Sequence, residues 1–326
     1  MENILEVKDL RVVYKTREEH VFAVNGVSFE LAEGETLGLV GETGAGKTTT
    51  ALSILQLLPR VAVIPSGSIR YKGKELVGAS QNSMQKIRGE KISMIFQDPM
   101  TSLNPVLTVG EQILEVIENH NVEGLNQLAL EKKVRRMLKM VDIHPRRRKE
   151  YPHQFSGGMR QRIGIAMALA CTPELLIADE PTTALDVTIQ AQVLRLMKDL
   201  RNRLGMAMIM ITHDLGVVAK TCDKVAVMYA GEIVEYGRIE AVFDRLVEHH
   251  PYTQGLFRAI PDLETRADRL VPIAGVPSDP TDLPEGCKFA PRCPQRHAAC
   301  EQLPEDVQLD GLRLKCHLFQ REAVRA

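Results

Sequence analysis

The chain has 326 residues, and 41 Lys and Arg against 42 Asp and Glu leave a formal net charge of −1. This length allows one large domain and a smaller one, and a content of 44% hydrophobic and 25% charged residues is typical of a globular protein. The neutral balance, the absence of Trp and the few aromatic residues argue against a nucleic-acid partner.

No apolar run approaches the ~18 residues that a membrane-spanning helix needs. The longest candidates, such as residues 206–211, have the length of a strand. Residues 1–7 do not combine a basic stretch with an apolar core, so we expect no secretory signal. We therefore expect the chain in the cytoplasm, with six cysteines that are free, catalytic or metal-bound rather than joined in disulfides.

The first motif follows a region that alternates apolar and polar residues from 1 to about 35, which predicts antiparallel strands. Residues 36–40 predict a short buried strand, and residues 49–55 predict a helix. Between them lies the sequence Gly41-Glu42-Thr43-Gly44-Ala45-Gly46-Lys47-Thr48. It fits the phosphate-binding pattern G-x-x-x-x-G-K-[ST] in the strand–loop–helix setting that the pattern requires, although a glycine-rich turn is the plainer alternative.

The residue types of this loop suit a nucleotide triphosphate. Glycines let the backbone turn its N–H groups inward, and the following helix directs its positive end toward the phosphates. Lys47 supplies a positive charge for the β- and γ-phosphates, and Thr48 offers a hydroxyl to Mg²⁺. The loop therefore predicts a nucleotide site.

Residues from about 98 to 165 are mostly helical in pattern, whereas strands 175–178 and 207–211 flank a helix over 187–204. This βαβ order predicts a parallel sheet with helices on its faces. The first of these strands ends in Asp179 and Glu180. In a chain with a phosphate loop, Asp179 suits Mg²⁺ and Glu180 suits the deprotonation of water, although an acidic turn is the plainer alternative.

A second glycine motif, Phe155-Ser156-Gly157-Gly158-Met159-Arg160-Gln161-Arg162, precedes a predicted helix over 163–170. A Ser-Gly-Gly at a helix start is either a backbone anion site or a plain capped turn. The motif resembles the signature of ATP-binding cassette (ABC) ATPases. Further residues match that family: Gln97 as the Q-loop, residues 184–186 as the D-loop, His213 as the switch histidine and Tyr14 as the aromatic under adenine.

The resemblance covers residues 1 to about 240 and implies an α/β fold. It implies a P-loop NTPase parallel-sheet core with an antiparallel β subdomain and a helical signature subdomain over about 98–165. The remaining residues, 241–326, would form a small cysteine-containing C-terminal extension of the oligopeptide/dipeptide-transporter kind. Single matches such as Tyr14 or His213 have plainer explanations as packed or surface residues.

ABC ATPases work as head-to-tail pairs, in which ATP lies between the phosphate loop of one subunit and the signature of the other. The resemblance implies that Glu180 is the general base, that His213 contacts the γ-phosphate, and that Gln97 is a further catalytic residue. Mg²⁺ would be held by Thr48, Gln97 and Asp179. The nucleotide-binding residues would be Tyr14, Gly41, Glu42, Thr43, Gly44, Ala45, Gly46, Lys47, Thr48, Thr49, Gln97, Asp179, Ser156, Gly157 and Gly158.

Four segments narrow the resemblance to importers of oligopeptides, dipeptides and nickel: residues 97–105, 151–162, 250–253 and 286–294. Membership of that group implies a second ATPase subunit (a paralogue or a copy), two transmembrane permeases and, indirectly, an extracytoplasmic solute-binding protein. It places the chain peripherally on the cytoplasmic face of the membrane. Nickel or another solute, export, a soluble ABC ATPase acting on DNA or ribosomes, and an adaptor that binds ATP without turnover remain alternatives.

Near residue 240 the sequence becomes rich in proline and loses periodicity, which predicts a module that does not rest on a large core. Four cysteines lie there in the spacing C-x5-C-x6-C-x15-C: Cys287, Cys293, Cys300 and Cys316. The spacing is too wide for paired C-x2-C zinc ribbons, but four thiolates suit zinc or an iron–sulfur cluster.

The resemblance to peptide importers implies a 4Fe-4S cluster on these four cysteines, with zinc as the alternative ligand. Free cysteines in a small core are the remaining interpretation. His297 and His317 could replace a thiolate, but we expect them to be bystanders. Cys171 and Cys222 lie in apolar surroundings, so we expect both to be buried and inert.

Overall fold

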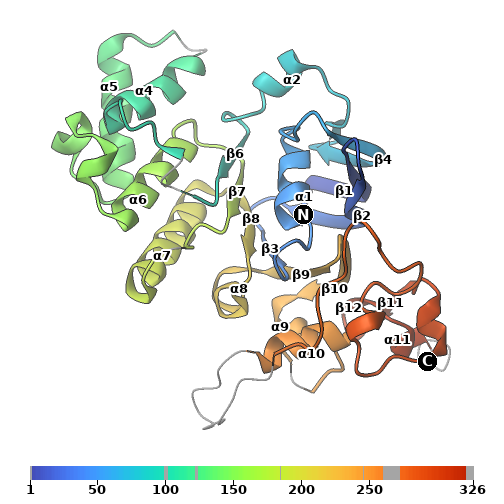
Figure 1. Cartoon of the computed structure of the whole chain (residues 1–326). Helices are drawn as coiled ribbons and strands as arrows, with labels where there is room; N and C mark the ends of the chain where they lie inside the picture. Colours follow the sequence, from blue (N-terminus) through green and yellow to red (C-terminus); the bar gives the residue numbers. More distant parts are fainter. Residues whose placement is uncertain are drawn as a thin grey trace. The chain divides into compact units, whose positions relative to one another are not determined.

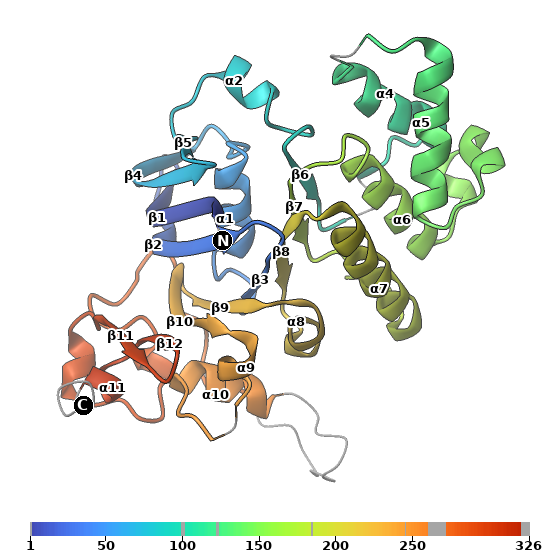
Figure 2. The same cartoon turned by 180° about the vertical axis from the view of Figure 1, so that it is seen from behind.

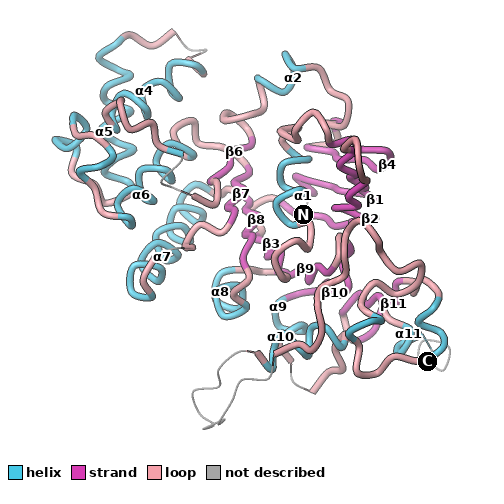
Figure 3. Tube along the Cα trace, viewed as in Figure 1, coloured by secondary structure: helices cyan, strands magenta, loops and turns pink. Residues whose placement is uncertain are grey.

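The computed structural model describes residues 2–98, 102–121, 124–183, 185–244, 246–259 and 272–320. The chain divides into two compact units. Unit 1 comprises Met1–Ile4, Ala32–Thr36 and Gly78–Ile211, and unit 2 comprises Leu5–Leu31, Leu37–Val77 and Thr212–Ala326. Figures 1 and 2 show the labelled elements from opposite sides, and Figure 3 colours them by type.

The antiparallel sheet of unit 2 precedes and follows the phosphate loop in sequence. Its strand order is β2-β1-β4-β5. Strand β1 pairs with β4 in antiparallel register, with Leu5 opposite Tyr71. The strands are β1 (Asn3–Lys15), β2 (His20–Ala32), β4 (Ala62–Tyr71) and β5 (Lys74–Glu75). The prediction of antiparallel strands before the loop is confirmed.

A second set of strands in unit 2 carries the loop itself. All five residues of β3 (Thr36–Val40) are buried, and β3 runs parallel to β9 (Lys224–Tyr229). Antiparallel pairs then join β9 to β10 (Glu232–Arg238), β10 to β12 (Leu312–Lys315) and β12 to β11 (Asp306–Leu309). The chain beyond residue 240 therefore extends the same sheet through β12, at positions 235–237 of β10.

One helix of unit 2 directly follows the phosphate loop, and the others lie in the C-terminal part of the chain. They are α1 (Lys47–Ile54), α8 (Leu215–Thr221), α9 (Ile239–Val242), α10 (Pro251–Arg258) and α11 (His317–Gln320), with 3-10 turns η3 (Ala290–Arg292) and η4 (Ala298–Glu301). An apolar cluster packs Tyr252, Phe289, Cys287 and Cys300 on Tyr229 of β9. The C-terminal region thus rests on an apolar core shared with the sheet, which the sequence pattern did not predict.

Unit 1 contains the predicted βαβ order and the helical region. Strands β6 (Ile92–Ile95), β7 (Leu175–Asp179) and β8 (Ala207–Thr212) are parallel neighbours. Figure 1 shows α7 (Val187–Leu204) beside β7. The other elements are α2 (Gln81–Gln85), α4 (Val109–Asn119), α5 (Gln127–Met140), η1 (Pro145–Lys149), η2 (Pro152–Gln154) and α6 (Gly157–Ala168).

Side-chain caps fix where the helices of unit 1 begin. The Asp186 carboxylate accepts a hydrogen bond from the Ile189 N–H, and Gly205 ends α7 in a left-handed conformation at φ 65°. Helix α6 begins at Gly157, earlier than the predicted start at 163, because Ser156 caps it. Within the described residues, no helix combines the length and apolarity that crossing a bilayer requires.

Candidate nucleotide-binding site

The phosphate loop of unit 2 joins β3 to α1, and two of its glycines are required by close backbone contacts. A Cβ at Gly41 would lie 2.2 Å from the Met228 carbonyl oxygen. A Cβ at Gly46 would lie 2.4 Å from the Ala23 carbonyl oxygen, and Gly46 has a φ of 95°. No larger residue fits either position without a shift of the backbone. The loop is therefore held tightly against β2 and β9.

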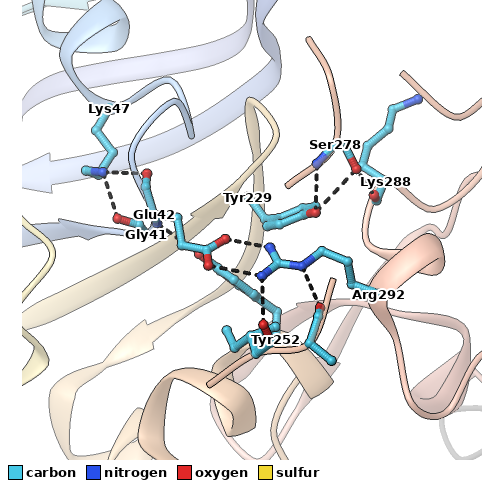
Figure 4. A network of polar contacts seen from close by, with 10 residues as sticks. Gly41, Glu42, Lys47, Tyr229, Tyr252, Ser278, Lys288 and Arg292 are labelled. Atoms are coloured by element: carbon cyan, nitrogen blue, oxygen red, sulfur yellow. Dashed lines mark hydrogen bonds and ion pairs between the residues drawn. The ribbon is translucent and has the colours of Figure 1, made fainter. Parts of the chain in front are cut away.

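Lys47 curls back onto its own loop. Its Nζ donates hydrogen bonds to the carbonyl oxygens of Gly41 at 2.7 Å and of Glu42 at 2.9 Å, as Figure 4 shows. Lys47 as a whole residue is only 6% exposed, whereas Thr43, Gly44 and Thr48 are exposed. A buried ammonium beside exposed loop residues places a positive charge where an anion can approach the backbone N–H groups.

Two further predicted residues meet in unit 2. The hydroxyl of Tyr14 on β1 and that of Thr49 on α1 share a hydrogen bond of 3.2 Å. Tyr14 is half-buried, so part of its surface remains accessible. The contact places the predicted aromatic residue next to the helix that begins at the phosphate loop.

The acidic pair in unit 1 lies where β7 ends. Asp179 is buried, with 2% exposure, and Glu180 is half-buried with a φ of 44°. That left-handed conformation is costly for a residue with a side chain, and such strain collects at functional sites. The carboxylate of Glu180 accepts hydrogen bonds from Gln97 Nε2 and from Thr183 Oγ1, both at 2.9 Å.

This arrangement brings together the predicted general base and the predicted Q-loop residue. Thr183 was not identified from the sequence, although a hydroxyl three residues after an acidic residue is a usual local hydrogen-bond pattern. Together Gln97 and Thr183 fix the orientation of the Glu180 carboxylate. A carboxylate held in this way can accept a proton from water at a defined position.

The signature segment forms the start of α6 in unit 1. The exposed Ser156 hydroxyl accepts a hydrogen bond from the Met159 N–H at 3.4 Å. A Cβ at Gly158 would lie 2.4 Å from Ile189 Cγ2, so Gly158 lets α6 pack closely on α7. The segment is thus a capped helix start with a packing role for Gly158. Contact of Ser156, Gly157 and Gly158 with nucleotide stays a prediction.

Of the remaining predicted site residues, the structure describes His213 but not every residue of the D-loop and Q-loop segments. His213 is exposed, directly after β8 and before Asp214, which caps α8. Ala184 of the predicted D-loop lies outside the described residues, as do residues 99–101 after Gln97.

Two residues of the C-terminal region contact the phosphate loop, and no role was predicted for either. Arg292 pairs with the Glu42 carboxylate, and the Tyr252 hydroxyl accepts a hydrogen bond from the Glu42 N–H. Both lie in segments whose sequence resembles peptide importers, but nothing in their local pattern links them to a loop 210 and 250 residues away.

The four C-terminal cysteines are thiols in one neighbourhood. Burial raises the pKa of Cys316 to about 12, and nearby Cys287, Cys293 and Cys300 raise it further. The six cysteines all lie among the described residues, and none of them forms a disulfide there. In that same part of the chain, no group of three or more His, Cys, Asp or Glu side chains has an arrangement that could hold a metal ion. The geometry therefore does not support the predicted cluster or zinc site.

His297 and His317, the two histidines near these cysteines in sequence, have local partners. His297 Nδ1 lies 3.2 Å from Cys300 Sγ, and His317 Nε2 lies 2.9 Å from the Gln302 carbonyl oxygen. Cys222 is buried, as expected. Cys171 is half-buried rather than fully buried, and burial is the main reason why its pKa is raised.

Family models match two parts of the chain. The ABC transporter model matches residues 24–183, and the model of the oligopeptide/dipeptide transporter C-terminal region matches residues 234–300. The dipeptide transport ATP-binding protein DppD of Bacillus subtilis is 48% identical, over 100% of this chain and 98% of its own length. The oligopeptide transport ATP-binding protein OppD of Escherichia coli is 50% identical, over 96% of this chain and 92% of its own.

Solved structures show the same fold. The dimeric post-hydrolysis structure of the ATP-binding cassette MJ0796, bound to ADP and Pi, matches with a TM-score of 0.65 and 28% identity, over 72% of this chain and 98% of that one. The cbiO1 structure from Clostridium perfringens has the same TM-score and identity, over 76% of this chain and 92% of its own. The chain therefore belongs to the ABC transporter ATPases, in the group that carries the oligopeptide/dipeptide transporter C-terminal region.

Proposed function

We propose that this chain is the ATP-binding and ATP-hydrolysing subunit of an ABC importer that takes up dipeptides or oligopeptides. The observation that carries the hydrolytic role is the Glu180 carboxylate, which Gln97 and Thr183 hold in the same chain as an intact phosphate loop. An adaptor that binds ATP without turnover has no need of an oriented base. The peptide cargo is supported by relatives named for dipeptide and oligopeptide transport that match nearly the whole chain.

The proposed roles follow the chemistry of each group. The loop N–H groups and Lys47 bind the phosphates, and Tyr14 contacts adenine. Hydroxyl, amide and carboxylate oxygens of Thr48, Gln97 and Asp179 are the hard donors that Mg²⁺ prefers, and the ion would neutralise charge on the triphosphate. Glu180 takes a proton from the attacking water. The further nucleotide-binding residues are Glu42, Thr43, Ala45 and Thr49, with His213 at the γ-phosphate.

The proposed assembly contains a second ATPase subunit, either a copy or a paralogue. Ser156, Gly157 and Gly158 of each subunit would cover the γ-phosphate that the loop of the other subunit holds. Two transmembrane permeases and, indirectly, a solute-binding protein complete the importer, so this subunit lies peripherally on the cytoplasmic face of the membrane. Import of nickel or another small solute is the alternative cargo for the same subunit.

Co-purification with the native membrane partners tests this proposal. The complex should hydrolyse ATP, and a solute-binding protein loaded with di- or oligopeptides should stimulate hydrolysis. Stimulation by nickel-loaded binding protein alone would replace peptide by metal as the cargo. Recovery of an active ATPase with no permease in the complex would contradict the transport role.

We also propose that Cys287, Cys293, Cys300 and Cys316 hold a 4Fe-4S cluster in the assembled protein. Support comes from four thiols in one neighbourhood, where burial and then the nearby Cys287, Cys293 and Cys300 raise the pKa of Cys316, and from the absence of a disulfide among the described cysteines. Binding would require the thiols to lose their protons and to move, since they are not arranged as ligands. Anaerobically purified protein should then contain about four iron and four sulfide per chain. Stoichiometric zinc in colourless protein would contradict this.

A further inference from the structure

We infer that Arg292 and Tyr252 are positioning residues for the phosphate loop: they hold Glu42 at its carboxylate and its backbone N–H, and Arg292 cancels its negative charge. This inference rests on the proposed ATP site and assigns part of the nucleotide affinity to the C-terminal region. Figure 4 shows the network, in which Glu42 lies between Lys47 and Arg292. All of these residues belong to unit 2.

Arg292 forms a bidentate ion pair with the Glu42 carboxylate through both guanidinium N–H₂ groups. Its Nη1 lies 2.6 Å from Glu42 Oε2, and its Nη2 lies 3.1 Å from Oε1. Its Nε donates to the Ala274 carbonyl oxygen at 3.0 Å, and the guanidinium lies 5.7 Å from the centre of the Tyr229 ring. With a side chain only 3% exposed, Arg292 is fixed in the fold before any nucleotide arrives.

Tyr252 accepts a hydrogen bond from one backbone N–H group of the phosphate loop, so that group already has a partner within the chain. Its hydroxyl accepts the Glu42 N–H at 2.9 Å, and burial raises the pKa of Tyr252, so the hydroxyl stays neutral. The ring is 0% exposed and packs against Tyr229 at 4.8 Å and Phe289 at 5.4 Å between ring centroids. Because Lys47 binds the Glu42 carbonyl oxygen, residue 42 is held at its N–H, its side chain and its carbonyl.

The negative charge of Glu42 affects how strongly the loop can bind a nucleotide. A carboxylate within a loop that receives phosphates repels the ligand, and the repulsion is strong where water is partly excluded. Glu42 is 31% exposed, so solvent alone does not screen it fully. Burial lowers the pKa of Arg292, but the interactions of its guanidinium with Glu42 and Tyr229 together raise that pKa, so the guanidinium stays charged. The pair therefore presents a neutral side-chain environment to the nucleotide.

Three variants of the full chain test the inference: Arg292→Met, Glu42→Gln and the double variant. Arg292→Met leaves the Glu42 charge uncompensated and should raise the Kd for a fluorescent ADP analogue by about tenfold or more. The double variant should return to within about threefold of Glu42→Gln, because no charge remains to be cancelled. In the assembled transporter, Arg292→Met should raise KM for ATP and leave kcat nearly unchanged.

Arg313→Met is the matched control, because Arg313 is also an arginine of the C-terminal region. It lies 4.8 Å from the Tyr236 ring and 3.7 Å from Asp306, and none of its observed contacts is with the phosphate loop. This control should leave the Kd unchanged. If Arg292→Met does not fold, the double variant and Arg292→Lys carry the test, since neither leaves a half-buried Glu42 carboxylate without a counter-charge.

The results separate this inference from the proposed function. Unchanged ADP affinity in folded Arg292→Met, or a loss that Glu42→Gln does not relieve, would overturn the positioning role while the ATP site stands. Absence of nucleotide binding by the unmodified chain would overturn the proposed function itself.

Discussion

The Nε2 atom of Gln97 donates a hydrogen bond to the Glu180 carboxylate across 2.9 Å, although the two residues are 83 positions apart. Gln97 follows β6 and Glu180 follows β7, and these strands are parallel neighbours. Because parallel neighbours end at the same edge of a sheet, the residues that follow them can meet. The pair defines the proposed hydrolytic end of the site, and its oriented carboxylate leads to the first two predictions.

Replacing Glu180 by Gln should remove the base while leaving nucleotide binding intact. The amide keeps the size and one acceptor oxygen of the carboxylate but cannot take a proton from water. We expect ATP-dependent dimerisation to persist and hydrolysis to fall by at least about a hundredfold. Steady-state phosphate release, with size-exclusion chromatography in ATP, measures both. Glu174→Gln, a change at a half-buried carboxylate that pairs with Lys91 in the same unit, is the control, and near-normal hydrolysis by Glu180→Gln would reject the base assignment.

Thr183→Val should impair hydrolysis without weakening ATP binding. The change removes the hydroxyl that donates to Glu180 at 2.9 Å, and Gln97 alone then orients the carboxylate. A lost hydrogen bond to a charged group of this kind corresponds to a fall in kcat of about tenfold. Thr221→Val, which removes a hydroxyl bonded to the Val217 carbonyl oxygen on α8, is the control. A raised KM with unchanged kcat would assign Thr183 to binding instead.

Gly158→Ala should destabilise the chain, because the new Cβ would lie 2.4 Å from Ile189 Cγ2. Overpacking of this kind typically costs about 1–3 kcal/mol. The double variant Gly158→Ala with Ile189→Leu removes the colliding branch and should recover most of the free energy of unfolding, measured in urea. If hydrolysis remains low in the stable double variant, Gly158 also acts at the nucleotide. Full recovery of both quantities would reduce its role to packing.

The buried His250 should make the stability depend on pH. Its Nδ1 accepts the Tyr252 N–H at 3.1 Å, and burial lowers the pKa of His250 to about 3. In the unfolded chain His250 has a pKa near 6.5 and binds a proton at a pH at which it stays neutral in the folded chain. The free energy of unfolding therefore falls as pH drops below 6.5. By about pH 5 the loss should reach roughly 2 kcal/mol, measured by urea unfolding.

His249 titrates with the opposite sign. The hydrogen bond to Glu235 at 2.7 Å raises the pKa of His249, so its contribution is complete below 6.5 and is lost as pH rises through the raised value. His250→Asn keeps a capping acceptor and should flatten the acid side of the profile alone. The exposed His153→Asn is the control. An unchanged acid limb in His250→Asn would show that another group causes it.

Local patterns predicted the elements well where caps and periodicity agree. The strand over 36–40 and the helix over 187–204 have the predicted bounds, because a buried apolar run and the Asp186 and Gly205 caps define them. The left-handed backbone of Glu180 could not be predicted, since it arises from the turn that follows β7 rather than from residue type.

Contacts between distant segments explain what the sequence did not reveal. Arg292 and Glu42 are 250 residues apart, and no periodicity links an arginine in a 3-10 turn to a phosphate loop. The cysteine spacing predicted a metal site, but spacing along the chain does not fix thiol geometry, and the described thiols are not arranged as ligands.

Uptake of a labelled peptide by the assembled transporter tests the central claim most directly. The proteoliposomes would contain this chain, its ATPase partner and the permeases. ATP would be supplied on the side of the membrane where this chain lies. The binding protein would present the peptide on the opposite side. We predict peptide accumulation on the ATP side that requires hydrolysis and is abolished by Glu180→Gln. Equal accumulation with Glu180→Gln, or ATP hydrolysis that moves no peptide, would contradict the account.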